Sequence, residues 1–173
     1  MAANPVRRLV AQPLTPAAFA PFGEVIAPEA AAEIERINEG HSLRHADLAR
    51  IDCGREGGRP AVSLMRTTPK AQPITLTCME RHPRGSQAFI PLSRRPFLVV
   101  VAPPGRFDPE RIAAFLAREG AGVNYRAGVW HHYSLALEGP SDFLVIDRAG
   151  PGENCEEVAL DPPVVIDLDG DVA

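Results

Sequence analysis

The sequence predicts a mainly β protein, an antiparallel β-barrel with a few short helices. Three observations support this prediction: the apolar segments are short, several of them alternate with a period of two, and Pro or Gly residues separate them. No internal repeat or low-complexity linker divides the chain. A length of 173 residues is enough for one domain with its own core, so we expect a single domain over residues 1–173.

The expected elements begin with a short helix over residues 15–20, where Thr15 can cap the helix and Pro16 can occupy its first position. Seven strands are expected, at residues 23–26, 61–67, 74–81, 87–92, 96–102, 129–137 and 142–147. A series of short strands favours a closed or nearly closed barrel. The tail after Asp161 alternates apolar and acidic residues, and we expect it either to add an edge strand or to remain loose.

A second helix is expected between two of these strands, over residues 108–118. Asp108 can cap its start, and Gly120 can end it. Phe115 and Leu116 would lie on one helical face and pack against the barrel.

Composition excludes several classes of protein. The net charge of −4 and the scatter of Arg residues among acids argue against nucleic-acid binding and favour a small-molecule partner. No apolar run approaches the roughly 20 residues that span a bilayer. The three cysteines, Cys53, Cys78 and Cys155, are far apart and odd in number, which favours reduced thiols and a cytoplasmic protein.

Candidate site residues lie at the end of the strand expected at residues 74–81. Alternation places every second side chain on one face: Ile74, Leu76, Cys78, Glu80 and His82. An apolar interior face therefore ends in a carboxylate and an imidazole. The same alternation in the strand expected at residues 129–137 puts His131 on the interior side and His132 on the other.

A buried carboxylate needs a partner because an unpaired charge in an apolar pocket is costly. Glu80 near His82 and His131 can be satisfied by a bound metal or by acid–base pairing, and either arrangement makes a reactive site. The structural alternative is that Glu80 forms an ion pair with Arg81 or Arg126 while His82 caps a turn. Spacing alone leaves both interpretations open.

The spacing also resembles the two motifs of metal-binding cupins. Residues 80–87 resemble the first motif, an H-x-H followed by an acid, and residues 120–131 resemble the second, which ends in a His. Glu80 replaces the first His, Gln87 replaces the acid, and Arg126 replaces a Pro of the second motif. The resemblance implies a cupin-like barrel, a double-stranded β-helix, more strongly than it implies a tight metal site.

Longer blocks resemble the ureidoglycolate lyase family and occur in the order found there. They are residues 14–26, 37–40, 44–48, 80–92, 122–132, 142–148 and 154–155. The resemblance implies a cupin-like fold, a homodimer, and cleavage of (S)-ureidoglycolate to glyoxylate and urea in allantoin and purine breakdown. It also implies a divalent metal, nickel in some members, for which Glu80, His82 and His131 are the candidate ligands.

The implied substrate carries a hydroxyl, a ureido nitrogen and a carboxylate on one carbon. Its cleavage needs a base for the hydroxyl proton and an acid for the departing nitrogen, and Glu80, His82 and His131 are the catalytic candidates. Candidates for substrate binding are Arg66, Arg81, Arg126 and Arg148, whose guanidinium groups suit a carboxylate, and Ser86, Gln87 and Asn124, which offer neutral polar groups.

Two other functions stay open at this point. One is an amidohydrolase that acts on the same substrate and releases ammonia, and the other is a non-catalytic cupin that binds a small carboxylate. Among single residues, Trp130 and Tyr125 are expected to pack in the barrel, and Cys78 is expected to be a small buried hydrophobic residue.

Overall fold

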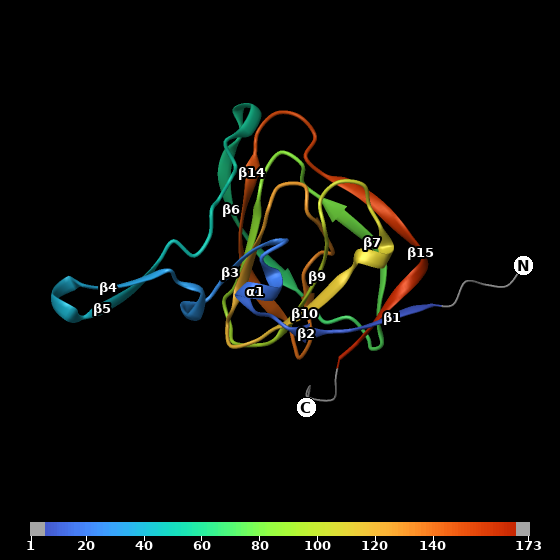
Figure 1. The fold of residues 1–173 in the computed structure, drawn as a ribbon, viewed down its shortest axis with the longest axis horizontal. Helices are drawn as coiled ribbons and strands as arrows, with labels where there is room; N and C mark the ends of the chain where they lie inside the picture. The colour runs from blue at the N-terminus through green and yellow to red at the C-terminus, as the bar shows by residue number, and fades with distance from the viewer. Residues whose placement is uncertain (1–5, 169–173) are drawn as a thin grey trace, which may run out of the picture.

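Two sheets face each other across an apolar interior and form a nearly closed barrel in the computed structural model, which describes residues 6–168 (Figure 1). The first sheet has the order β1 (Arg7–Val10), β15 (Glu156–Asp167), β7 (Ile74–Arg81), β12 (Trp130–His131), β9 (Phe97–Ala102), β10 (Ala113–Ala117) and β2 (Gln12–Pro13), with β13 (Leu135–Ala136) also paired with β9. The second has the order β3 (Gly23–Ile26), β11 (Gly122–Tyr125), β8 (Gln87–Pro91), β14 (Ser141–Ala149) and β6 (Arg59–Thr67).

The remaining elements are one hairpin and five short helices. The hairpin pairs β4 (Glu33–Ile37) with β5 (Ser42–Ala46) and projects from the barrel (Figure 1). The helices are α1 (Pro16–Phe19) and the 3₁₀ turns η1 (Pro28–Ala30), η2 (Asn38–Gly40), η3 (Arg55–Gly57) and η4 (Pro109–Arg111). The predicted fold class, a mainly β, cupin-like barrel with few short helices, is therefore confirmed. The single domain over residues 1–173 stays a prediction, and its first and last five residues lie outside the described range.

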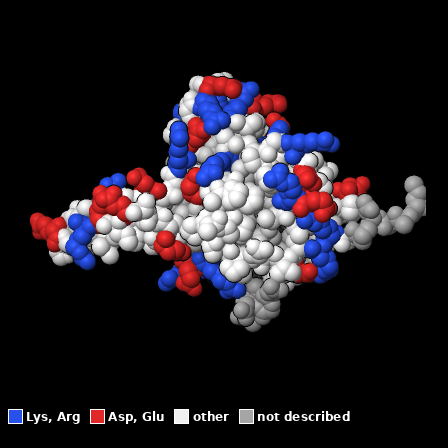
Figure 2. Space-filling view, in the orientation of Figure 1, with Lys and Arg blue, Asp and Glu red and all other residues white. Residues whose placement is uncertain are grey.

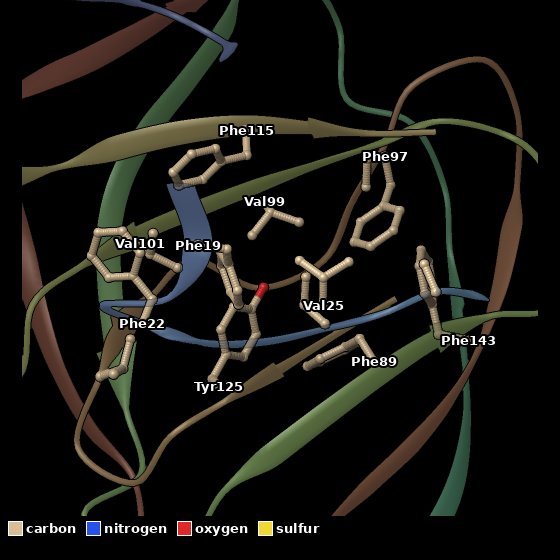
Figure 3. Packing of buried hydrophobic residues seen from close by; sticks show 14 of the residues in the cluster. Phe19, Phe22, Val25, Phe89, Phe97, Val99, Val101, Phe115, Tyr125 and Phe143 are labelled. Atoms are coloured by element: carbon tan, nitrogen blue, oxygen red, sulfur yellow. The ribbon is translucent and has the colours of Figure 1, made fainter. Parts of the chain in front are cut away.

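Strand β9 separates two apolar cores because both of its faces are buried. Phe97, Val99 and Val101 point into the barrel interior, where aromatic side chains from several elements pack against them (Figure 3). Leu98, Val100 and Ala102 belong to a second core on the other side of the sheet. A strand buried on both faces is a continuous apolar run, as this one is.

The first predicted helix is confirmed, and the second is wrong. The hydroxyl of Thr15 accepts a hydrogen bond from the Ala18 amide at 3.2 Å and caps α1. In place of a helix over residues 108–118, the turn η4 leads into strand β10, whose Phe115 faces the first core and whose Ala114 faces the second. The run is apolar on both strand faces, so it lacks the alternation that would have identified a strand.

Other predicted strands are confirmed with shifted ends, and two expectations need correction. The strand expected over residues 129–137 is two short strands, β12 and β13, separated by residues 132–134, although the His132 amide still donates to the Val100 carbonyl of β9. The tail does form a strand, β15, but it lies between β1 and β7 and is not an edge. No helix among residues 6–168 is long and apolar enough to cross a membrane.

Candidate active site

Neighbouring strands bring Glu80, His82 and His131 together. Glu80 of β7 stands directly opposite His131 of β12 in the antiparallel ladder, and His82 follows two residues after Glu80. The Glu80 Oε1 atom lies 3.7 Å from Nδ1 of His131 and 4.0 Å from Nε2 of His82. The two imidazole centroids are 5.1 Å apart. The three residues named from the sequence as catalytic and metal candidates thus form one cluster.

Both imidazoles in this cluster have a buried nitrogen without a hydrogen-bond partner. His82 Nδ1 lies 2.6 Å from the Asn154 carbonyl oxygen, and His131 Nδ1 lies 3.3 Å from the carbonyl oxygen of the next residue. A carbonyl only accepts, so each Nδ1 is the donor in its contact. Within the described residues neither Nε2 atom is paired, although both are buried. Such groups are uncommon in folded proteins, and these two are available to a bound molecule or ion.

Burial sets the charge of the cluster. Burial raises the pKa of Glu80, and the nearby His82 partly offsets the rise. Burial, followed by the proximity of His82, lowers the pKa of His131 to about 3, so this imidazole is neutral at physiological pH. Glu80 is only partly buried, with about a quarter of its side chain exposed. A carboxyl group with a raised pKa therefore lies beside a neutral imidazole.

Tyr125 packs in the barrel as expected and also positions the cluster. Its ring stacks on His131 with centroids 4.4 Å apart and planes 2° from parallel. The same ring contacts Phe19 and Phe89 in the first core (Figure 3). Trp130 packs in the second core, which confirms the expectation for that residue.

Gln87 is the predicted substrate-binding residue that faces the interior. It shares a face of β8 with Phe89, pairs across the ladder with Tyr125, and keeps its Oε1 atom buried without a partner. Its Nε2 atom donates to Asp147 at 3.4 Å. Asp147 was missed from the sequence, although Phe143, Val145 and Asp147 alternate along β14, and that alternation places its carboxylate on the core side.

The four arginine candidates for the substrate carboxylate are engaged elsewhere. Arg81 lies over the Trp130 ring and bonds Glu156, on the opposite side of β7 from Glu80. Arg126 is paired with Glu24. Neither arginine forms the ion pair with Glu80 that was the structural alternative.

Arg66 and Arg148 are also held away from the cluster. Arg66 makes a two-point contact with Asp142, with N–O distances of 2.7 and 2.8 Å, on the outer side of β6. Arg148 is buried and donates to three backbone carbonyl oxygens, of Arg55, Glu56 and Pro151.

Ser86 and Asn124, the remaining candidates, lie on the outer side of the five-stranded sheet. The Ser86 hydroxyl accepts from the Asp52 amide at 2.8 Å. Asn124 donates to Glu24 at 2.8 Å and faces away from the neighbouring Tyr125. A separate cavity of about 290 Å³ lies there, lined by Glu24, Arg50, Asp52, Arg55, Ser86, Arg126 and Ala127. Of the substrate-binding residues predicted from the sequence, Gln87 therefore faces the barrel interior, Ser86 and Arg126 line this outer cavity, and the other four line neither.

The central cluster fits a divalent metal. Glu80, His82 and His131 each offer one ligand atom, and these atoms lie within 4.8 Å of one another. Two imidazole nitrogens and a carboxylate oxygen suit nickel or zinc better than magnesium or calcium. The His131 imidazole is neutral, which is the state that metal binding requires.

Known proteins resemble this chain over nearly its whole length. Residues 6–167 match the family model described as ureidoglycolate lyase. A protein of Burkholderia mallei (strain NCTC 10229) named ureidoglycolate lyase is 52% identical over 155 residues, which cover 90% of this chain and 91% of the relative. Proteins with the same name from Burkholderia cepacia and Brucella anthropi are 51% identical over 162 residues (93% of this chain, 90% of the relative) and 52% identical over 152 residues (88% and 89%).

Proposed function

The chain belongs to the ureidoglycolate lyase family, and on that premise we propose that it cleaves (S)-ureidoglycolate to glyoxylate and urea. The observation that carries the proposal is the cluster in which Glu80 Oε1 lies 4.0 Å from His82 Nε2 and 3.7 Å from His131 Nδ1, with the Nε2 atoms of both imidazoles buried and unpaired within the described residues. This arrangement offers hydrogen-bond acceptors and an acid in one small space. Those are the groups that cleavage of a hydroxyl-bearing carbon–nitrogen bond needs.

The proposed reaction moves one proton at each end of the breaking bond. His82 Nε2 takes the proton of the substrate hydroxyl, and the oxygen electrons form the carbonyl of glyoxylate. The carbon–nitrogen bond breaks, its electrons pass to the ureido nitrogen, and protonated Glu80 delivers a proton there to give urea. The 4.0 Å separation of His82 Nε2 and Glu80 Oε1 then allows the proton to return from His82 to Glu80.

His131 has a different part in this scheme. Its neutral ring, held by stacking on Tyr125, keeps Nε2 as a fixed acceptor that orients the substrate hydroxyl. Gln87 Oε1 and the Asp147 carboxylate are acceptors on the facing sheet for the N–H groups of the urea end. If Glu80, His82 and His131 instead hold a divalent metal, they would serve as ligands and not as the acid and base, and the metal would act as a Lewis acid on the hydroxyl or carboxylate of the substrate.

We also propose that the protein is cytoplasmic, that it is a homodimer, and that it acts in allantoin and purine breakdown. The free thiols of Cys53, Cys78 and Cys155 support a reducing compartment. The pathway follows from the proposed substrate.

The test is product analysis. Purified, chelator-treated protein is incubated with racemic ureidoglycolate, with and without added nickel or manganese, and urea, glyoxylate and ammonia are followed separately. The proposal predicts urea and glyoxylate in equal amounts from half of the racemate. Ammonia in place of urea would identify an amidohydrolase, and no turnover with either metal would favour a cupin that binds a carboxylate without reacting it.

A further inference from the structure

The outer cavity of about 290 Å³ has no part in the proposed reaction. Its walls come from the segment between β5 and β6 and from the neighbouring ends of β3, β8 and β11. A cavity of this size is at the lower end of ligand pockets, so it suits a molecule of a few non-hydrogen atoms. The polar residues that line it are Glu24, Arg50, Asp52, Arg55, Ser86 and Arg126.

Both acidic residues of this cavity are already paired with arginine. Asp52 Oδ2 lies 2.5 Å from an amino nitrogen of Arg55. Glu24 Oε1 lies 3.1 Å from Nε of Arg126, and Glu24 Oε2 accepts a hydrogen bond from Asn124 at 2.8 Å. The lining contains three arginines and two carboxylates, so these pairs leave one positive charge over.

Arg50 supplies the unpaired charge. It is exposed, and its guanidinium group makes no hydrogen bond or ion pair with another residue of the range 6–168. Its backbone is held in place, because its carbonyl oxygen accepts from the fully buried Asn124 at 3.1 Å. A free guanidinium group beside a cavity offers paired N–H donors, which bind a carboxylate at two points.

Two further donors of the cavity are ordered by the protein. The Arg126 guanidinium group donates to the Ala20 carbonyl at 2.9 Å and to Glu24, while its Nη2 atom has no partner in the described part of the chain. Ser86 is 2% exposed, and its hydroxyl accepts from the Asp52 amide at 2.8 Å, so its own proton is left to donate. Donors that are ordered before binding lose little entropy when a ligand arrives.

The surface charge around the cavity is mixed in sign. Turn η3, which contains Arg55, is drawn in blue-green above β6 in Figure 1, and basic and acidic groups lie side by side in that part of Figure 2. Such a surface lacks the broad basic field that attracts a polyanion or a nucleic acid. The mixture favours a small ligand with a single negative charge.

We propose that the outer cavity binds a small molecule with one carboxylate group, at a site separate from the interior cluster. The carboxylate accepts from the free guanidinium group of Arg50 and from the ordered donors of Ser86 and Arg126. A dianion is disfavoured, because its second charge meets the carboxylates of Glu24 and Asp52. The inference goes beyond the proposed reaction and does not depend on it.

The test titrates trifluoroacetate, a small monocarboxylate, into the protein at constant ionic strength and follows its ¹⁹F signal by NMR. Arg50→Gln removes the free guanidinium group. Arg94→Gln is the matched control, because it removes the same charge from a side chain that is 81% exposed and paired with Glu119. His82→Gln changes the interior cluster instead, and circular dichroism checks that every variant keeps its strands.

The proposal predicts saturable binding to the wild type with a Kd on the order of 1 mM. It predicts a Kd at least about 10-fold higher for Arg50→Gln, because charge-assisted hydrogen bonds are lost, and no change for Arg94→Gln or His82→Gln. No saturable binding would overturn the proposal. So would an equal loss in Arg50→Gln and Arg94→Gln, or a loss in His82→Gln alone, since the carboxylate would then bind to general surface charge or to the interior cluster.

Competition identifies the source of the carboxylate. Glyoxylate is the product of the proposed reaction, whereas acetate has no part in it. Displacement of trifluoroacetate by glyoxylate alone would support a site for that product, and displacement by both would support a site for monocarboxylates of other origin as well. Displacement by neither would overturn the assignment of the cavity to small monocarboxylates.

Discussion

The barrel interior and the projecting hairpin lack interaction partners of opposite kinds. In the interior, polar atoms of His82, His131 and Gln87 are buried and have no partner among residues 6–168. On the hairpin, Ile34 and Leu43 are apolar and exposed without cover. A buried acceptor is satisfied by a small polar molecule or an ion, whereas an exposed apolar face is satisfied by another protein surface. The two regions therefore leave different kinds of interaction unmet, polar in the interior and apolar on the hairpin.

The largest predicted effect is on catalysis in the interior. His82→Gln keeps a polar side chain but removes the nitrogen that takes the substrate proton, so kcat should fall by roughly 10³-fold. His41→Gln is the matched control, because His41 is exposed in the hairpin turn, and kcat should change by less than about twofold. Steady-state kinetics with ureidoglycolate measures both. A near-normal kcat for His82→Gln would contradict the assignment of His82 as the base that takes the substrate proton.

Stability should separate the two regions next. Val99→Ala removes methyl groups from the fully buried core below the cluster and should lower the free energy of unfolding by about 2–4 kcal/mol at any protein concentration. Val62→Ala makes the same change at an exposed position of β6. Its effect on the free energy of unfolding should be within about 0.5 kcal/mol, because little apolar surface is buried there. Denaturant unfolding of both variants measures the difference, and equal losses would contradict the assignment of Val99 to the core.

The smallest effect is expected at the substrate's urea end. Gln87→Ala removes the unpaired Oε1 acceptor, so KM should rise about 10-fold while kcat changes little. Gln12→Ala, at an exposed position of β2, should leave KM unchanged. An unchanged KM for Gln87→Ala would mean that the urea end binds elsewhere, with the outer cavity around Arg126 as the next place to examine.

Period-two alternation correctly grouped the cluster but misplaced part of its strand. The pairing of Glu80 with His131 follows from two strands whose interior sides could be assigned from the sequence. The apolar face assumed for β7 is broken, because Met79 joins Ile74 and Leu76 in the second core while Cys78 does not. The partner strand β15 shifts register between Ala159 and Val164 beside this point. Alternation cannot anticipate such an irregularity.

Residues whose roles depend on distant partners could not be predicted. Whether Arg66 or Arg126 is available to a substrate depends on Asp142 and Glu24, 76 and 102 residues away along the chain. The β4–β5 hairpin was missed because it projects from the barrel. A strand pair that is not packed on a core does not need one apolar face and one polar face, so its sequence lacks that pattern. Asp147 could have been predicted from the sequence, since it continues the alternation of Phe143 and Val145.

The most direct test of the account follows ureidoglycolate labelled with ¹³C at its central carbon by NMR, with wild-type enzyme and with Glu80→Gln. The account predicts that the wild-type enzyme moves the label into glyoxylate as an equal amount of urea appears. It predicts that Glu80→Gln, which cannot deliver the proton to the departing nitrogen, forms both at least about 100-fold more slowly. Ammonia release by the wild type, or full activity of Glu80→Gln, would contradict it.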